Sequence, residues 1–198
     1  GTGTINDDDA APTIQGVTSA TQVEGTALVH TVTLTNASSS STSFAYTLGG
    51  GSATSGTDYT NPPTFSNGVT LVAGNLIVPA GVTSFTVTVP TTLDTIDEGA
   101  SENYNLSVGG VAATGTITDD DNAPSIASVS SANAVEATSI VHTVTLSNAS
   151  SSNTSYTLSL ADVSATGGGT DYTSTLTNAA FSNGVTLAAG IITVPAGV

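Results

Sequence analysis

The stretch Leu28-Val29-His30-Thr31-Val32-Thr33-Leu34 has the two-residue period of a β-strand. Successive side chains of a strand point to opposite faces, so the two leucines, His30 and Val32 share one face while the threonines share the other. The last six residues of the stretch return unchanged as Val141-His142-Thr143-Val144-Thr145-Leu146. The chain is therefore predicted to be built from β-strands, at least one of which occurs twice.

The repetition has the length of a domain. Gly3-Thr4-Ile5-Asn6-Asp7-Asp8-Asp9 corresponds to Gly115-Thr116-Ile117-Thr118-Asp119-Asp120-Asp121, an offset of 115 − 3 = 112 residues. A repeat of this length can bury a core of its own, unlike the units of about 20 to 50 residues that form solenoids. We therefore expect separate folded modules joined in tandem.

Three parts of the chain follow from this offset. Residues 1–9 are predicted to be the last strand and acidic joint of a preceding module. Residues 10–121 are predicted to form a complete module, which we call the first repeat. Residues 122–198 form an incomplete second repeat, because they contain no counterpart of residues 83–112.

The first repeat contains several more stretches with the pattern of short strands, separated by clusters of Gly, Pro, Asn and Ser. They are Ile14–Val17, Phe44–Leu48, Val69–Val72, Leu76–Val78, Phe85–Val89, Tyr104–Val108 and Val111–Ile117. Seven or eight short strands in a domain of this size are typical of an immunoglobulin-like sandwich. The predicted fold class is all-β, with tandem immunoglobulin-like antiparallel β-sandwich modules.

The incomplete second repeat has two interpretations. The sequence is an arbitrary window on a longer array, or chains complete one another by strand exchange in an extracellular filament. Gly3–Ile5 of a neighbouring chain could replace only the last missing strand. We therefore favour the window on a longer array.

The charge balance excludes several classes of partner. Of 198 residues, 15 are Asp or Glu and none is Lys or Arg, which gives a formal net charge of -15 at pH 7. Binding to nucleic acid or to anionic lipid depends on Lys and Arg, so neither partner is expected. No apolar run reaches the roughly 18 residues of a membrane helix, and membrane insertion is not expected. The composition, rich in Ser, Thr, Gly, Asn and Ala, favours an extracellular place on a bacterial cell surface.

No catalytic constellation is present in the sequence, and the chain is predicted not to be an enzyme. A Gly-x-Ser-x-Gly elbow with its partners and a Gly-rich loop followed by Lys are both absent. His30 and His142 occupy equivalent positions on the apolar face of a strand, where a structural histidine with satisfied hydrogen bonds is expected. Calcium prefers oxygen ligands to imidazole, so neither histidine is expected to bind it.

The carboxylates of the first repeat lie at predicted turns and strand ends. Without Lys or Arg, a cation is their natural counter-charge, and calcium takes about 6 to 8 oxygen ligands from such loops. The alternative is that Asp-rich turns are solvated linkers. The candidate ligands in the first repeat are Glu24, Asp58, Asp94, Asp97, Glu98, Glu102, Asp119, Asp120 and Asp121. Their counterparts elsewhere in the chain are Asp7, Asp8, Asp9, Glu136 and Asp171.

Four sequence elements resemble, in this order, those of the Calx-beta domain. They are Val23-Glu24-Gly25, Gly56-Thr57-Asp58-Tyr59, Asp94-Thr95-Ile96-Asp97-Glu98 with Glu102-Asn103-Tyr104-Asn105-Leu106, and Gly115–Asp121. The resemblance covers the whole first repeat. It implies that calcium ions gather at one end of the sandwich, held by an early Glu, the Asp before a Tyr, an acidic loop and terminal aspartates.

The stretch Ala27–Leu34 and the abundance of Ser, Thr and Ala are also similar to the extender repeats of giant bacterial adhesins of the large-adhesive-protein, RTX-adhesin type. That resemblance implies an extracellular array of calcium-stiffened modules that supports attachment and biofilm formation. Its partners would be neighbouring repeats of the same chain and, in a fibre, like chains. Two alternatives are a calcium sensor and a sugar-binding sandwich. The second is disfavoured because aromatic residues make up only 5% of the chain and Trp is absent.

Overall fold

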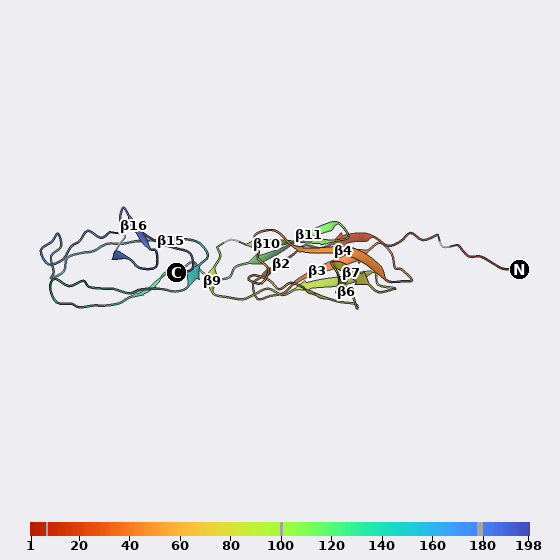
Figure 1. The fold of residues 1–198 in the computed structure, drawn as a ribbon, viewed down its shortest axis with the longest axis horizontal. Coiled ribbons are helices and arrows are strands. Elements are labelled where there is room, and N and C mark those ends of the chain that lie inside the picture. Colours follow the sequence, from red (N-terminus) through yellow and green to blue (C-terminus); the bar gives the residue numbers. More distant parts are fainter. Residues whose placement is uncertain (7, 100, 178–179) are drawn as a thin grey trace. The chain divides into compact units, whose positions relative to one another are not determined.

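The computed structural model describes residues 1–6, 8–99, 101–177 and 180–198, and its regular structure consists of β-strands. The predicted all-β class is confirmed. The chain divides into two compact units (Figure 1). The first unit comprises Gly1–Asp94 and Ala100–Asp119, and the second comprises Thr95–Gly99 and Asp120–Val198. Among the described residues, no helix is long and apolar enough to cross a membrane.

Two sheets form the sandwich of the first unit. The four-stranded sheet has the order β1 (Ile14–Val17), β3 (Leu28–Leu34), β8 (Ser84–Val89) and β5 (Thr64–Phe65). The six-stranded sheet has the order β2 (Ala20–Val23), β11 (Val111–Thr118), β10 (Glu102–Val108), β4 (Thr42–Gly49), β7 (Asn75–Val78) and β6 (Thr70–Val72). The strands pair antiparallel, as predicted, except that β2 and β11 run parallel.

The core lies between these sheets, because each strand buries alternate side chains. In β3 the burial alternates over the whole strand, with Leu28 and Val32 fully buried. Phe85, Val87 and Val89 of β8 are buried in the same alternation. Burial of such side chains stabilises the fold by about 1.5–3 kcal/mol each, before the entropy of ordering is subtracted.

The hairpin β6–β7 is encoded locally. Ala73 and Gly74 connect the two strands and both have positive φ, 48° and 79°, which is the combination of a type I′ turn. The second unit repeats this hairpin between β16 (Thr186–Ala188) and β17 (Ile191–Val194), with φ of 49° at Ala189 and 77° at Gly190. Two residues between two short strands are therefore enough to fix this element in both units.

The second unit contains three small sheets. The first pairs β12 (Ile126–Val129) with β13 (Val144–Leu146), and the second pairs β14 (Ala149–Ser150) with β9 (Ile96–Asp97). The third has the order β15 (Thr154–Thr157), β17 and β16. Ile192 and Val194 are buried in this unit. Ile126, Ile140 and Val144 correspond to the core residues Ile14, Leu28 and Val32 of the first unit, but they are exposed.

Candidate metal centre

The parallel pairing of β2 and β11 brings Glu24 next to Asp119. Val23 at the end of β2 is in register with Thr118 at the end of β11, so the residues that follow each strand emerge side by side. The Glu24 amide donates a hydrogen bond to the Thr118 carbonyl at 3.0 Å. Carboxylate oxygens of Glu24 and Asp119 lie within 4.8 Å of each other, although Glu24 is 6% exposed.

A second pair forms where the turn at Asp58 meets the start of β10. The Asp58 carboxylate accepts a hydrogen bond from the Thr54 amide, and the Asp58 amide donates to the Thr54 carbonyl at 2.9 Å. This turn holds the Asp58 side chain at 9% exposure. One of its oxygens lies within 4.8 Å of an oxygen of Glu102, the first residue of β10.

The remaining candidates of the acidic loop and the terminal triplet occupy different environments. Asp94 is half-buried, and its amide donates to Oε1 of Glu24 at 3.3 Å. Asp97 and Glu98 are half-buried residues of the second unit. The carbonyl of Asp97 accepts hydrogen bonds from the Ser150 hydroxyl at 3.0 Å and from the Ser151 amide at 2.9 Å.

The terminal triplet continues from β11 with alternating exposure. Asp119 and Asp121 are half-buried, whereas Asp120 is exposed. Alternation of this kind is what an extended backbone produces.

The described counterparts outside the first repeat lack the burial of Glu24 and Asp58. Asp7 lies outside the described residues, and Asp8 and Asp9 are exposed. Glu136, the counterpart of Glu24, is exposed. Asp171 keeps the turn of Asp58, because its carboxylate accepts from the Thr166 amide at 2.7 Å, but the side chain is exposed.

Asp162 is the one carboxylate that the sequence did not single out. Its Oδ1 accepts hydrogen bonds from the Tyr172 hydroxyl at 2.5 Å and from the Gly167 amide at 2.8 Å. The hydrogen bond from Tyr172 lowers the pKa of Asp162. The first repeat has no acid between Glu24 and Asp58, so comparison of the repeats gave no signal for this residue.

His30 has a structural role in the core of the first unit. Its Nδ1 lies 2.7 Å from the Thr18 carbonyl and its Nε2 lies 2.9 Å from the Tyr104 hydroxyl. A carbonyl only accepts, so Nδ1 carries the proton and Tyr104 donates to Nε2. Burial lowers the pKa of His30, while the hydrogen bond to Thr18 opposes that shift. The expected histidine with both ring nitrogens satisfied is confirmed.

The donor set of the first unit fits a hard cation. The two carboxylate pairs offer only oxygen atoms, which is the donor type that calcium takes. A pair of carboxylates held together at low exposure repels, and no Lys or Arg exists in the chain to compensate that charge. A bound divalent ion would supply the missing positive charge.

One protein family matches the sequence of this chain. The model of the Calx-beta domain matches residues 7–129 and residues 119–196. A search of curated proteins finds no match.

Solved structures similar to the chain include three Calx domains. CBD12 from CALX1.2 is 18% identical with a TM-score of 0.43, and the match covers 60% of this chain and 48% of that one. The calcium binding domain CBD12 of CALX1.1 has the same identity and TM-score, with 60% and 49% covered. The apo-form Calx CBD1 domain is 21% identical with a TM-score of 0.41, with 56% and 96% covered. The chain thus spans about half the length of the first two structures.

Proposed function

This chain belongs to the Calx-beta domain family, and from that premise we propose that its first repeat binds calcium and serves as a structural module of an extracellular array. The observation that carries the proposal is the meeting of Glu24 with Asp119 and of Asp58 with Glu102. Each pair joins residues far apart in sequence, at low exposure and without a basic side chain. An arrangement that costs electrostatic free energy in the absence of a cation is best explained by cation binding.

Carboxylates from different elements of the first unit would serve as ligands of the bound ions. Within the first unit, Glu24 and Asp119 would hold one ion, and Asp58 and Glu102 would hold another. The ion would supply positive charge that cancels the repulsion within each group. Asp94, whose amide donates to Oε1 of Glu24, would add a further ligand or negative charge beside the first ion.

Calcium titration by calorimetry tests this assignment. The full chain is expected to bind calcium, and Glu24→Gln together with Asp119→Asn should weaken the affinity of that site at least about tenfold. Glu136→Gln is the matched control, because Glu136 is the exposed counterpart of Glu24, and its effect should stay within about twofold. The assignment would be refuted if the unaltered chain did not bind calcium, or if both variants lost calcium affinity to the same extent.

The array role rests on the short joint between the repeats. Only Asn122 and Ala123 separate Asp121 from Pro124, and Pro restricts the backbone at the start of the next repeat. A cation held by the terminal aspartates would restrict the rotation of one repeat against the next. Such stiffening suits a stalk or fibre on a bacterial surface that supports attachment and biofilm formation, with neighbouring repeats and like chains as partners.

Residual dipolar couplings on two complete repeats in tandem test the stiffening. A narrow distribution of inter-repeat orientations in calcium and a broad one in EGTA are expected. Equally broad distributions would limit calcium to the fold of each repeat, and the array proposal would be withdrawn.

A calcium-sensing role rests on the same family membership and the same carboxylates. Affinity separates the two roles. A structural module in a calcium-rich medium needs a Kd of about 10⁻⁴ to 10⁻³ M, whereas a sensor needs about 10⁻⁷ to 10⁻⁵ M. The titration above therefore decides between them.

A further inference from the structure

The acidic loop of the first repeat contains a segment that folds with the second unit. Thr95–Gly99 lies in sequence between two stretches of the first unit, but its residues belong to the second. The chain therefore enters the second unit twice, at residue 95 and again at residue 120. A segment that leaves its own repeat, folds with the next one and then returns connects the two repeats a second time.

Strand pairing holds this segment in the second unit. Its strand β9 runs parallel to β14, with Ile96 in register with Ala149 and Asp97 in register with Ser150. The Asp97 carbonyl accepts a hydrogen bond from the Ser151 amide at 2.9 Å and another from the Ser150 hydroxyl at 3.0 Å. Ser150 is 5% exposed, so its hydroxyl bond is formed where little water competes.

The turn that receives β9 is built in the same way in both units. Asn148-Ala149-Ser150 has the counterpart Asn36-Ala37-Ser38. In each turn the Asn side chain donates to a backbone carbonyl 26 residues earlier at 2.8 Å, and the Ser hydroxyl accepts from the amide two residues later at 3.2 Å. The Ser carbonyl accepts from Gly81 at 2.8 Å in the first unit and from Gly197 at 2.9 Å in the second. Each repeat therefore forms this turn from its own residues.

The two turns differ in burial. Ala149 is half-buried and Ser150 buried, whereas Ala37 is exposed and Ser38 half-buried. Because the hydrogen bonds within the two turns agree, we assign the difference to β9, which covers the turn of the second unit. A turn that is already formed lowers the ordering cost of adding a strand to it.

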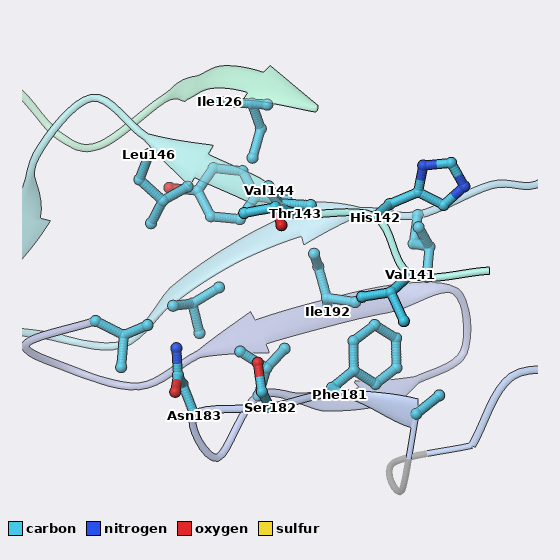
Figure 2. Close-up of a pocket in the computed structure, with 16 residues that line it drawn as sticks. Ile126, Val141, His142, Thr143, Val144, Leu146, Phe181, Ser182, Asn183 and Ile192 are labelled. Atoms are coloured by element: carbon cyan, nitrogen blue, oxygen red, sulfur yellow. The ribbon is translucent and has the colours of Figure 1, made fainter. Parts of the chain in front are cut away.

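The receiving turn is separate from the apolar cavity of the second unit (Figure 2). Val141, Val144 and Phe181 contribute to the lining of that cavity, whereas neither Ala149 nor Ser150 does. The pairing of β9 with β14 therefore does not depend on what occupies the cavity.

We propose that Thr95–Gly99 is a docking segment, through which one repeat binds the Asn-Ala-Ser turn of the next repeat by strand pairing. The partner surface is the backbone of residues 149–151, and the Ser150 hydroxyl adds a side-chain contribution. Consecutive repeats are then connected by this segment as well as by the linker at Asn122 and Ala123. The inference goes beyond the proposed calcium binding and does not rest on it, because the contacts are made by backbone groups and a hydroxyl.

Disulfide formation tests the pairing and its register. The chain has no Cys, so Ile96→Cys together with Ala149→Cys introduces two thiols on neighbouring strands, where Cα atoms lie within the roughly 7 Å that a disulfide allows. The matched control is Ile96→Cys together with Ala37→Cys, which places the second thiol in the corresponding turn of the first unit. In EGTA the disulfide within one chain should form at least about tenfold faster in the first variant than in the control, as measured by mass spectrometry. Equal rates in the two variants, or bridges that join two chains, would overturn the inference.

Hydrogen exchange at the Ser151 amide tests the contribution of the hydroxyl without introducing a thiol. Ser150→Ala should speed exchange of this amide about fivefold in EGTA, because the hydroxyl no longer helps to hold the Asp97 carbonyl. Ser38→Ala is the matched control, since the Ser38 hydroxyl makes the same bond within its own turn, and its effect on Ser151 should stay within about twofold. A Ser151 amide that exchanges freely in the unaltered chain, or equal effects of the two variants, would overturn the inference. Both measurements are made in EGTA, so they test docking whether or not the chain binds calcium.

Discussion

The hexapeptide Val-His-Thr-Val-Thr-Leu occurs twice in this protein and has two different environments. As Val29–Leu34 it lies within β3, with His30 and Val32 completely buried. As Val141–Leu146 only its last three residues form a strand, and its valines are 77% and 46% exposed. In the first unit β3 pairs with both β1 and β8, whereas among the described residues β13 pairs with β12 alone. An alternating sequence therefore predicts a strand, but a distant partner decides its burial.

The turn Ala73-Gly74 shows the opposite case, an element that forms in the same way in both units. Its hairpin is repeated at Ala189-Gly190 with φ angles that agree within a few degrees. Here the strands and the connecting residues lie next to one another in sequence, so no distant partner is needed. Local and non-local contributions to the fold are thus separated within one chain.

The largest expected difference concerns Leu28 and its counterpart Ile140. Leu28→Ala should destabilise the first unit by about 3 kcal/mol, because Leu28 is completely buried and leaves a cavity. Ile140→Ala should change the second unit by less than about 1 kcal/mol, since Ile140 is 51% exposed. Hydrogen exchange of each unit, read by mass spectrometry, measures both. Similar losses of stability in the two units would mean that both copies of this strand pack in a core.

A second comparison uses the paired glycines Gly115 and Gly3. Gly115 lies opposite Tyr104 in the β10–β11 ladder, and a Cβ at this position would be 2.1 Å from the Tyr104 ring. Gly115→Ala should therefore destabilise the first unit by about 2 kcal/mol through overpacking. Nothing lies within 4 Å of a Cβ at Gly3, so Gly3→Ala should change the melting temperature very little. A tolerated Gly115→Ala would show that the ring can move aside.

The two histidines provide the next test, which includes a dependence on pH. His30→Gln should cost about 1–2 kcal/mol by disrupting the bonds to Thr18 and Tyr104. His142→Gln serves as the control because His142 is exposed.

The sign of the pH effect follows from the lowered pKa of His30, which burial causes. The folded state keeps this ring neutral, whereas the unfolded state takes up a proton below about pH 6.5. The contribution of His30 to stability is therefore complete above that pH and decreases as the pH falls below it. As the pH is lowered from about 7.5 to 5.5, thermal unfolding should show a smaller loss of stability in His30→Gln than in the unaltered chain. A larger loss of stability in the variant than in the unaltered chain would contradict the conclusion that the buried ring of His30 is neutral.

The smallest effect is expected at Tyr46, whose counterpart in the second repeat is Leu158. The Tyr46 hydroxyl is buried and has no hydrogen-bond partner among the described residues. Tyr46→Phe should leave stability unchanged or raise it by up to about 1 kcal/mol, because an unsatisfied buried hydroxyl is removed. Chemical denaturation measures the change. A marked loss of stability would reveal a partner for this hydroxyl.

Periodicity and repetition predicted much of the fold, because they depend on neighbouring residues. The alternation in Leu28–Leu34 and in Tyr104–Val108 identified two of the buried strands. The parallel pairing of β2 with β11 was not predicted, since it joins residues almost a hundred positions apart. That pairing is what brings Glu24 to Asp119.

The acidic residues were found as a set from their positions at turns, but their partners could not be read from the sequence. Glu24 and Glu136 have the same local sequence signal, Val followed by Glu. One is buried beside β11 and the other is exposed. Burial and pairing of a carboxylate depend on strands that are distant in sequence, so the choice between ligand and solvated acid requires the fold.

The most direct test of calcium binding by the first unit is hydrogen exchange of the full chain in calcium and in EGTA. Binding to the folded state alone stabilises it by about 2.7 kcal/mol at a hundredfold excess of ligand over Kd. Calcium is therefore expected to slow exchange across the first unit, most strongly around Glu24, Asp58 and the end of β11, with a much smaller change around Glu136. Identical exchange in calcium and EGTA, or equal protection at Glu24 and Glu136, would contradict a calcium site built by the pairing of Glu24 with Asp119.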